Sequence, residues 1–98
     1  MPVYRLSRAA DDDIDAIFFA GIEMFGVAHA ETYYAGLSAA LAFLADNPFA
    51  ARLRREIEPP VRAWRHKAHL IVYEVDTDGI LVLRVRHGRE DWLGSGEE

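Results

Sequence analysis

The C-terminal part of this sequence gathers the side chains best suited to act on an anionic or acidic partner. Its cationic candidates are Arg84, Arg86, His87 and Arg89. A metal-free phosphodiester reaction needs an acid or base that titrates near neutral pH, together with cations that stabilise the transferring phosphate. A histidine among arginines meets that need, so a ribonuclease is one hypothesis. Arginine and tryptophan also dominate binding hot spots, and Trp92 follows the arginines, so recognition of a protein partner is the competing hypothesis.

These arginines end a predicted strand over residues 80–86. Strict alternation places Leu81, Leu83 and Val85 on one face, and Ile80, Val82, Arg84 and Arg86 on the other. A strand that begins apolar on both faces and ends with arginines on one of them leaves the core and reaches solvent or a partner. An edge strand whose arginines guard against aggregation has the same pattern, and periodicity alone does not separate the two interpretations.

Other catalytic and ligand-binding patterns are weak in this sequence. His66 and His69 flank a tight turn, but no matching set of Asp, Glu or His stands near them, so no metal site is predicted. None of the serines lies in a Gly-x-Ser-x-Gly setting. The seven glycines are scattered and form no phosphate-binding loop. The sequence therefore predicts no catalytic nucleophile and no cofactor.

The length and composition predict one domain over residues 1–98, with residues 93–98 as a polar, flexible tail. The absence of cysteine excludes a disulfide framework and Cys-ligated zinc. No apolar stretch approaches about 18 residues, so no membrane span is expected. The first residues lack the apolar region of a signal peptide. We therefore expect a cytoplasmic protein that does not engage a membrane.

The net charge of −5 argues against a general nucleic-acid binder, but it conceals an asymmetry. Residues 1–51 hold two basic and seven acidic side chains, whereas residues 52–89 hold nine basic and five acidic ones. The last nine residues add four acids and no base. A basic middle section favours a local positive surface suited to an acidic partner. Internal pairing of these arginines with Glu56, Glu58 and the acidic tail is the alternative.

The first half of the chain reads as a short strand followed by two helices. Val3–Leu6 alternates like a strand, and Ser7 is a plausible N-cap ahead of acids that complement the helix dipole. The acids are Asp11, Asp12, Asp13 and Asp15. The first apolar stripe is Ile14, Ile17, Phe18, Ile22 and Phe25, and the second is Tyr33, Leu37, Ala40, Leu41 and Leu44. A break near Gly26 and a stop at Asn47-Pro48 predict an antiparallel helical hairpin whose aromatics belong to the core.

The second half reads as strands. Residues 49–60 form an extended connector that contains paired prolines. Strands are expected over residues 61–66, 69–75 and 80–86, and Asp76-Thr-Asp-Gly79 is a strong hairpin signal. The order β-α-α-β-β-β predicts an α+β fold, in which the helical hairpin packs on one face of an antiparallel sheet.

Several segments taken together resemble the ParE toxins of bacterial ParD–ParE toxin–antitoxin modules, within the RelE/ParE superfamily. The likeness covers residues 4–93. The matching segments are Tyr4-Arg-Leu-Ser7, Ala10-Asp-Asp-Asp-Ile14, Tyr33-Tyr-Ala-Gly-Leu37, Phe43-Leu-Ala-Asp-Asn-Pro48, Arg52-Leu-Arg-Arg-Glu-Ile57, Pro60-Val-Arg62, His69-Leu-Ile-Val-Tyr73 and Val82-Leu-Arg-Val-Arg-His-Gly-Arg-Glu-Asp-Trp92. The predicted fold agrees with the fold that this resemblance implies.

The resemblance implies a non-enzymatic toxin that inhibits DNA gyrase by direct binding and is neutralised by a ParD antitoxin in a hetero-oligomeric complex. No direct contact with nucleic acid is implied. The candidate target-binding residues are Arg84, Arg86, His87, Arg89, Asp91 and Trp92. The candidate antitoxin-binding residues are Arg52, Arg54, Arg55, Arg62 and Arg65, which suit an acidic segment that folds on binding. Alternatively, Trp92 folds back on the sheet.

The resemblance extends to ribonucleases of the RelE type, which cleave ribosome-bound mRNA. In those relatives the end of the last strand carries a pattern similar to His-Arg-x-x-x-Tyr. This chain carries Gly88 in place of the arginine and Trp92 in place of the tyrosine. Glycine offers no cation to a phosphate, and indole has no hydroxyl, so the segment fits recognition better than catalysis. A RelE-like mRNA endonuclease remains the alternative function, and a binding module without toxicity is the third.

Overall fold

The chain is described by a computed structural model in which residues 3–88 are placed. Its elements are β1 (Val3–Leu6), α1 (Arg8–Phe25), α2 (Val27–Asp46), β2 (Leu53–Arg54), β3 (Val61–His66), β4 (His69–Asp76) and β5 (Gly79–His87). The predicted order of one strand, two helices and three strands is confirmed. The short strand β2 is an addition, and it lies inside the segment that the paired prolines predicted to be an extended connector.

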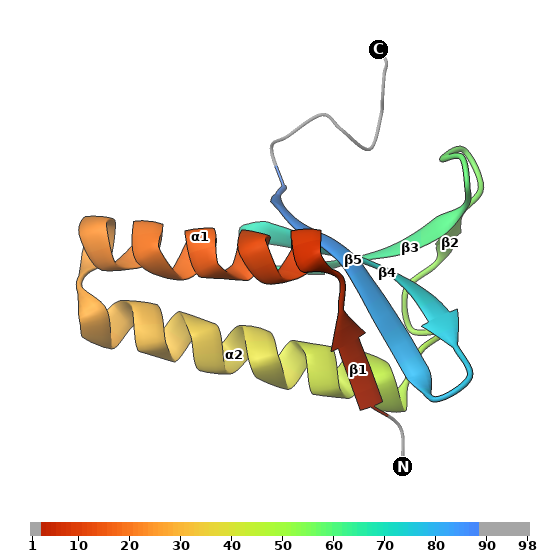
Figure 1. Cartoon of the computed structure of the whole chain (residues 1–98), viewed down its shortest axis with the longest axis horizontal. Helices are drawn as coiled ribbons and strands as arrows, with labels where there is room; N and C mark the ends of the chain where they lie inside the picture. The colour runs from red at the N-terminus through yellow and green to blue at the C-terminus, as the bar shows by residue number, and fades with distance from the viewer. Residues whose placement is uncertain (1–2, 89–98) are drawn as a thin grey trace.

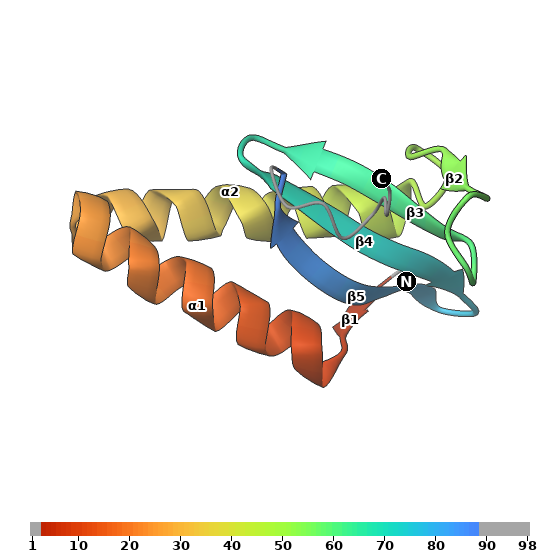
Figure 2. The ribbon, with the colours of Figure 1, turned by 90° about the horizontal axis from the view of Figure 1, so that it is seen from above.

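The strands form one sheet in the order β1-β5-β4-β3-β2, and the helical hairpin covers one face of it (Figure 2). This arrangement confirms the α+β prediction. Neighbours among β2 to β5 run antiparallel, as predicted, whereas β1 pairs with β5 in parallel. The direction of β1 relative to β5 depends on the path that the chain takes through the helices and the other strands. No local sequence pattern predicts that path.

Local signals explain the hairpin. The Ser7 hydroxyl accepts a hydrogen bond of 3.0 Å from the Ala10 N–H, which confirms the predicted N-cap. Gly26 separates the helices with φ of 91°, a conformation that favours glycine, and its N–H closes the last turn of α1 on the Ile22 carbonyl. The C-cap of α2 is Asn47, immediately before Pro48. The two helices consequently lie side by side and antiparallel (Figure 1).

The core lies between the hairpin and the sheet. Its buried members are Ala10, Ile14, Leu37, Leu41, Leu44, Ala45, Ala51, Ile71, Tyr73, Ile80, Val82 and Val85. The predicted α2 stripe is therefore confirmed at its three leucines. In α1 the predicted stripe is buried only near its start, because the tip of the hairpin projects past the sheet (Figure 1). Phe25, near that tip, is 61% exposed, so its assignment to the core was wrong.

A bulge in β5 overturns the alternation predicted for that strand. Tyr73 pairs with Val82 but Val72 pairs with Arg84, which leaves Leu83 as an extra residue. One extra residue moves every later side chain to the other face. Val85 therefore joins Ile80 and Val82 in the core, and Arg84 does not share their face.

Candidate functional site

One edge of the distal part of β5 pairs with β4, whereas its other edge is held by Ser7 and Asp13 at the start of α1 rather than by a strand. β1 ends at Leu6, opposite Val82. Beyond that point the Ser7 N–H donates to the Val82 carbonyl at 2.9 Å, and the Ser7 hydroxyl donates to the Leu83 carbonyl at 2.8 Å. The Asp13 carboxylate then accepts from the Val85 N–H at 2.9 Å. The start of α1 therefore continues the hydrogen bonding of the sheet edge after β1 has ended.

Asp13 also binds the first of the predicted target-binding arginines. Arg84 Nε donates to Oδ2 of Asp13 at 2.8 Å and Nη2 donates to Oδ1 at 3.1 Å, a two-point geometry that is stronger than a single contact. Partial burial of Asp13 raises its pKa, but the hydrogen bonds from Arg84 and Val85 outweigh that effect, so the pKa is lowered overall. The prediction that Asp13 serves the helix dipole was incomplete, since its carboxylate anchors β5.

Of the remaining candidate target-binding residues, two lie in the part of the chain that the structure describes and three lie outside it. Arg86 lies opposite Leu70, and His87 lies opposite His69 with their ring centroids 5.5 Å apart. His87 is exposed and Arg86 is half-buried. Arg89, Asp91 and Trp92 lie outside the described residues.

Gly88 has a neighbour that the sequence did not reveal. A Cβ at this position would lie 2.5 Å from Nη1 of Arg65 and 3.0 Å from its Cζ. The guanidinium group of Arg65 therefore occupies the space that any side chain at position 88 would need. The structure brings one predicted antitoxin-binding arginine beside the predicted target-binding segment, although 23 positions separate the two residues. No local sequence signal predicts that contact.

Tyr33 connects α2 to the histidines at the same end of the sheet. Its hydroxyl lies 2.6 Å from Nδ1 of His69 and 3.4 Å from the carbonyl oxygen of His66. Burial raises the pKa of Tyr33, so the phenol stays protonated. His66 Nε2 is buried and has no hydrogen-bond partner among residues 3–88. The ring packs against α2 at Gly36, where an added Cβ would make only an ordinary contact of 3.5 Å with Nε2.

His66 is expected to make the protein less stable in mild acid. Burial lowers its pKa in the folded state, and the charge of Lys67 lowers it further. The pKa of a histidine in the unfolded chain is about 6.5. Below that pH, His66 binds a proton more readily in the unfolded chain than in the folded protein, so the free energy of unfolding decreases as pH falls toward the folded pKa. In urea unfolding between about pH 8 and 5, His66→Gln should lose less stability than the wild type. His29→Gln is the matched control, because His29 is exposed on α2. Parallel pH profiles for wild type and His66→Gln would contradict this expectation.

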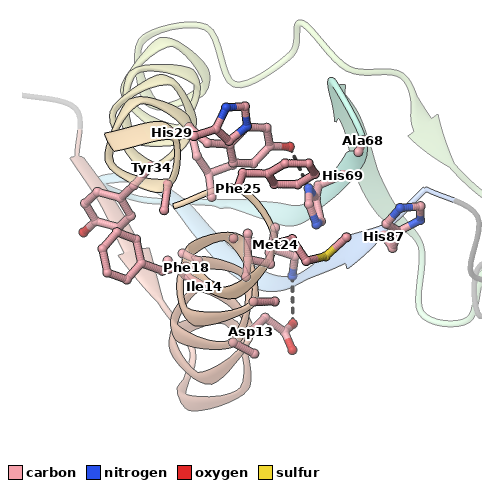
Figure 3. Close-up of a pocket in the computed structure, with 18 of the residues that line it drawn as sticks. Asp13, Ile14, Phe18, Met24, Phe25, His29, Tyr34, Ala68, His69 and His87 are labelled. Atoms are coloured by element: carbon pink, nitrogen blue, oxygen red, sulfur yellow. Dashed lines mark hydrogen bonds between the residues drawn. The ribbon is translucent and has the colours of Figure 1, made fainter. Parts of the chain in front are cut away.

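A cavity of about 580 Å³ opens between the hairpin and the ends of β4 and β5 (Figure 3). Its walls are mainly apolar, with His29, His69 and His87 among the polar groups that face it. This size falls within the range of ordinary ligand pockets. Phe18, Phe25 and Tyr33 line it. None of the three is among the buried residues of the core, so the prediction that the stripe aromatics belong to the core was wrong. The helical period is the same for a core stripe and for a cavity wall, which is why the sequence missed it.

The candidate antitoxin-binding arginines all come from β2, β3 and the segments beside them. Arg54 donates to Glu56 at 3.2 Å. Arg62 donates to the Ala51 carbonyl at 2.7 Å and lies over the ring of Phe49 at 4.9 Å. Internal contacts therefore engage these two arginines. The exposed members are Arg52, Arg55 and Arg65.

The described residues were also examined for metal sites and for helices that could cross a membrane. Residues 3–88 contain no group of three or more His, Cys, Asp or Glu side chains placed to hold a metal ion. Among the same residues, neither helix has the combination of length and hydropathy that a membrane crossing requires.

Known proteins of one toxin family are similar to this chain over most of its length. The family model described as ParE toxin of type II toxin-antitoxin system, parDE, matches residues 4–92. Toxin ParE1 of Mycobacterium tuberculosis (strain CDC 1551 / Oshkosh) is 35% identical over 89 residues, which cover 90% of this chain and 91% of that protein. Toxin ParE1 of Caulobacter vibrioides (strain ATCC 19089 / CIP 103742 / CB 15) is 29% identical over 87 residues, or 89% of this chain and 90% of that protein.

A solved structure of the chromosomal ParDE TA system from P. aeruginosa has the same fold. Its TM-score is 0.74 at 23% identity, and the match covers 89% of this chain and 96% of that one. The sequence matches place the protein among the toxins of type II toxin–antitoxin systems. Within that class, the chain belongs to the ParE toxin family.

Proposed function

We propose that this toxin binds DNA gyrase directly and inhibits it without catalysing a reaction, and that a ParD antitoxin neutralises it in the cytoplasm. The match of the ParE family model over residues 4–92 carries the proposal. The end of β5 supports the target side of it, because that strand presents Arg86 and His87 while Asp13 anchors their neighbours.

The target surface consists of the distal end of β5 and the residues that follow it. Arg86 and His87 are its described members, with Arg89, Asp91 and Trp92 continuing it along the sequence. Arg84 is a positioning residue in this proposal, since its guanidinium group is bound to Asp13.

The antitoxin surface combines two regions: the arginines of β2, β3 and the segments beside them, and the cavity between the hairpin and the ends of β4 and β5. The arginines are Arg52, Arg54, Arg55, Arg62 and Arg65. They suit an acidic segment, while the apolar walls of the cavity suit the apolar face of an amphipathic one. Such a partner buries exposed side chains near the tip of the hairpin, including Met24 at 72% exposure and Phe25 at 61%.

Arg86→Glu is expected to weaken gyrase inhibition by about 30-fold, because truncating or reversing a hot-spot arginine costs on the order of 2 kcal/mol. The measurement is the toxin concentration that halves the supercoiling activity of purified gyrase. Arg8→Glu, at an exposed arginine of α1, is the matched control and should leave that concentration unchanged. Unimpaired supercoiling at a large excess of wild-type toxin would overturn the proposed target.

One contact favours the mRNA endonuclease as a second candidate function. Arg65 brings a guanidinium group to Gly88, where the resemblance places an arginine in ribonuclease relatives. His69 and His87 lie on the neighbouring strands β4 and β5, with their imidazole rings packed edge to face. This candidate predicts cleavage of ribosome-bound message that is lost in His87→Ala. Intact transcripts after induction of the toxin would exclude it.

A further inference from the structure

Arg65 of β3 and Arg86 of β5 lie on the same face of the sheet. Arg65 is opposite Leu70 in the register of β3 and β4, and Leu70 is opposite Arg86 in the register of β4 and β5. Residues that are opposite one another on neighbouring strands direct their side chains to the same face. Because neighbouring strands lie about 4.8 Å apart, the backbones of the two arginines are separated by about 10 Å.

This face is the one that the helical hairpin does not cover (Figure 2). One position away along the three strands lie Trp64, Ile71 and Val85, which are opposite one another in the same registers. Ile71 and Val85 are buried in the core, and Trp64 packs against it. Successive side chains of a strand alternate between the two faces, so the row that holds the two arginines points away from the hairpin. Arg86 borders the cavity as well, because it lies near the end of β5.

The side chain of Arg65 crosses β4 toward the end of β5. Its Nη1 atom lies 2.5 Å from the position that a Cβ at Gly88 would take, and its Cζ and Nη2 atoms lie 3.0 Å from that position. The Gly88 N–H donates to the Ala68 carbonyl at 2.7 Å, which ties Gly88 to the turn between β3 and β4. Gly88 lies two positions after Arg86. The guanidinium group of Arg65 therefore reaches the same end of β5 as Arg86.

The environment of Arg65 suits a partner that carries an acidic side chain. Arg65 is exposed, and the ion pairs formed within residues 3–88 use other arginines, namely Arg5, Arg54 and Arg84. A guanidinium group presents a rigid fork that binds a carboxylate through two parallel hydrogen bonds. The half-buried Leu70 lies beside it and offers an apolar contact. The surface therefore fits an acidic side chain that projects next to an apolar one.

We propose that Arg65, which belongs to the antitoxin surface in the proposed function, is also a target-binding residue. Its guanidinium group and that of Arg86 bind one acidic side chain of the protein that the toxin inhibits, and an apolar neighbour of that acid packs on Leu70. Arginine is among the residue types that dominate binding hot spots. The inference rests on the proposed function in taking the target to be a protein.

Gly88→Ala tests the position of the guanidinium group without changing any charge. The added methyl group would take the space that Nη1 of Arg65 now occupies, so the guanidinium group has to move. Gly88→Ala and Arg65→Ala should each raise the toxin concentration that halves gyrase supercoiling by about tenfold. The double variant should be no weaker than Arg65→Ala, because the methyl group then displaces nothing.

Three results of this cycle would overturn the inference. They are an unchanged concentration for Arg65→Ala, an unchanged concentration for Gly88→Ala, and a loss of about a hundredfold in the double variant, which is the product expected of independent effects. Arg55→Ala is the matched control, because Arg55 is an exposed arginine beside β2. It should inhibit like the wild type, and an equal loss there would show that only general positive charge is needed. Urea unfolding of each variant should match the wild type, since neither Arg65 nor Gly88 belongs to the buried core.

Growth arrest separates failure of this inference from failure of the proposed function, because it presumes no particular target. The same variants are induced in cells that lack the antitoxin. If the wild type arrests growth but leaves gyrase active, the proposed target is wrong, while the same non-additive loss of growth arrest keeps Arg65 on the target surface. If the wild type inhibits gyrase and the variants inhibit it equally, the proposed function stands and the inference fails.

Two further outcomes of the induction experiment also count against the inference. Cleaved transcripts that depend on Arg65 would assign its guanidinium group to a phosphate of RNA instead of an acidic side chain. Variants that keep full growth arrest and lose only affinity for the antitoxin would leave Arg65 on the antitoxin surface alone. A wild type that neither arrests growth nor inhibits gyrase would overturn both proposals.

Discussion

Replacing Gly79 with alanine is expected to lower the free energy of unfolding by about 4 kcal/mol, which is the largest effect of any single substitution considered. Gly79 begins β5 with φ of 154°, a conformation that other residues rarely adopt. Its partner in the parallel register is Val3. A Cβ at Gly79 would lie 1.9 Å from the Val3 carbonyl oxygen and 2.8 Å from the Val3 nitrogen.

This overlap involves backbone atoms, so no side-chain rotation relieves it. The Val3 N–H is itself bound to the Asp78 carbonyl at 2.9 Å, and β1 would have to separate from β5. The expected cost combines backbone strain of about 1–3 kcal/mol with overpacking of about 1–3 kcal/mol. For a chain of this size, such a loss lowers the melting temperature by roughly 15–30 °C. Urea and thermal unfolding followed by far-UV circular dichroism measure both quantities.

Gly26→Ala is the matched control for this substitution. Gly26 also has a positive φ, of 91°, but nothing lies within 4 Å of the Cβ that alanine would add. Only backbone strain remains, so the expected loss is about 1–2 kcal/mol. Equal losses at Gly26 and Gly79 would show that β1 does not approach β5 as closely as the parallel register requires.

Asp13→Ala is expected to lower the free energy of unfolding by about 3 kcal/mol. The substitution leaves the partly buried Val85 N–H without its acceptor and removes both contacts of Asp13 with Arg84. An unsatisfied buried donor costs about 1–3 kcal/mol, and hydrogen bonds to charged groups contribute about 1.5–3 kcal/mol. Asp12→Ala is the control, because Asp12 is exposed on the same turn, and its effect should stay within about 0.5 kcal/mol.

Asp13→Asn separates the charge from the hydrogen bond. The amide oxygen still accepts from Val85, so stability at neutral pH should fall by only about 1 kcal/mol. The pKa of Asp13 is lowered in the folded state, so the unfolded chain binds more protons between that value and about 3.9. Stability contributed by Asp13 is present above about pH 4 and is lost as pH falls toward the folded pKa. The acid limb of the stability profile should be flatter in Asp13→Asn. An unchanged acid limb would contradict the assigned contact.

Local signals predicted the helical hairpin and the order of helices and strands along the chain, and long-range contacts account for what was missed. Ser7, Gly26 and the Asn47-Pro48 pair determine helix ends through capping and steric rules that act within a few residues. The bulge at Leu83 has no such local cause. It depends on how β4 and β5 meet, so strict alternation assigned Val85 to the wrong face.

The residue types of the candidate site could be predicted from the sequence, but the contacts that these residues make could not. The basic run of β5 is visible in the sequence, and its exposed end at His87 agrees with the expectation that the strand leaves the core. The roles of Asp13 and Arg65 were not visible, because each reaches a residue more than 20 positions away. Tyr33 was assigned to a core stripe, and its contact with His69 required the fold to bring α2 beside β4.

The central place of β5 also determines when the sheet can form during synthesis. β5 lies between β1 and β4, yet among residues 3–88 it is the last strand that the ribosome produces. Tyr4 cannot pair with Ile80, its partner in the parallel register, until β5 has been made. The helical hairpin and the β3–β4 pair can form earlier, because their contacts are local. Synthesis proceeds at about 5–20 residues per second, so several seconds separate the two strands. The paired strand that carries Arg86 and His87 therefore forms only after residues 79–87 have been made, several seconds after β1.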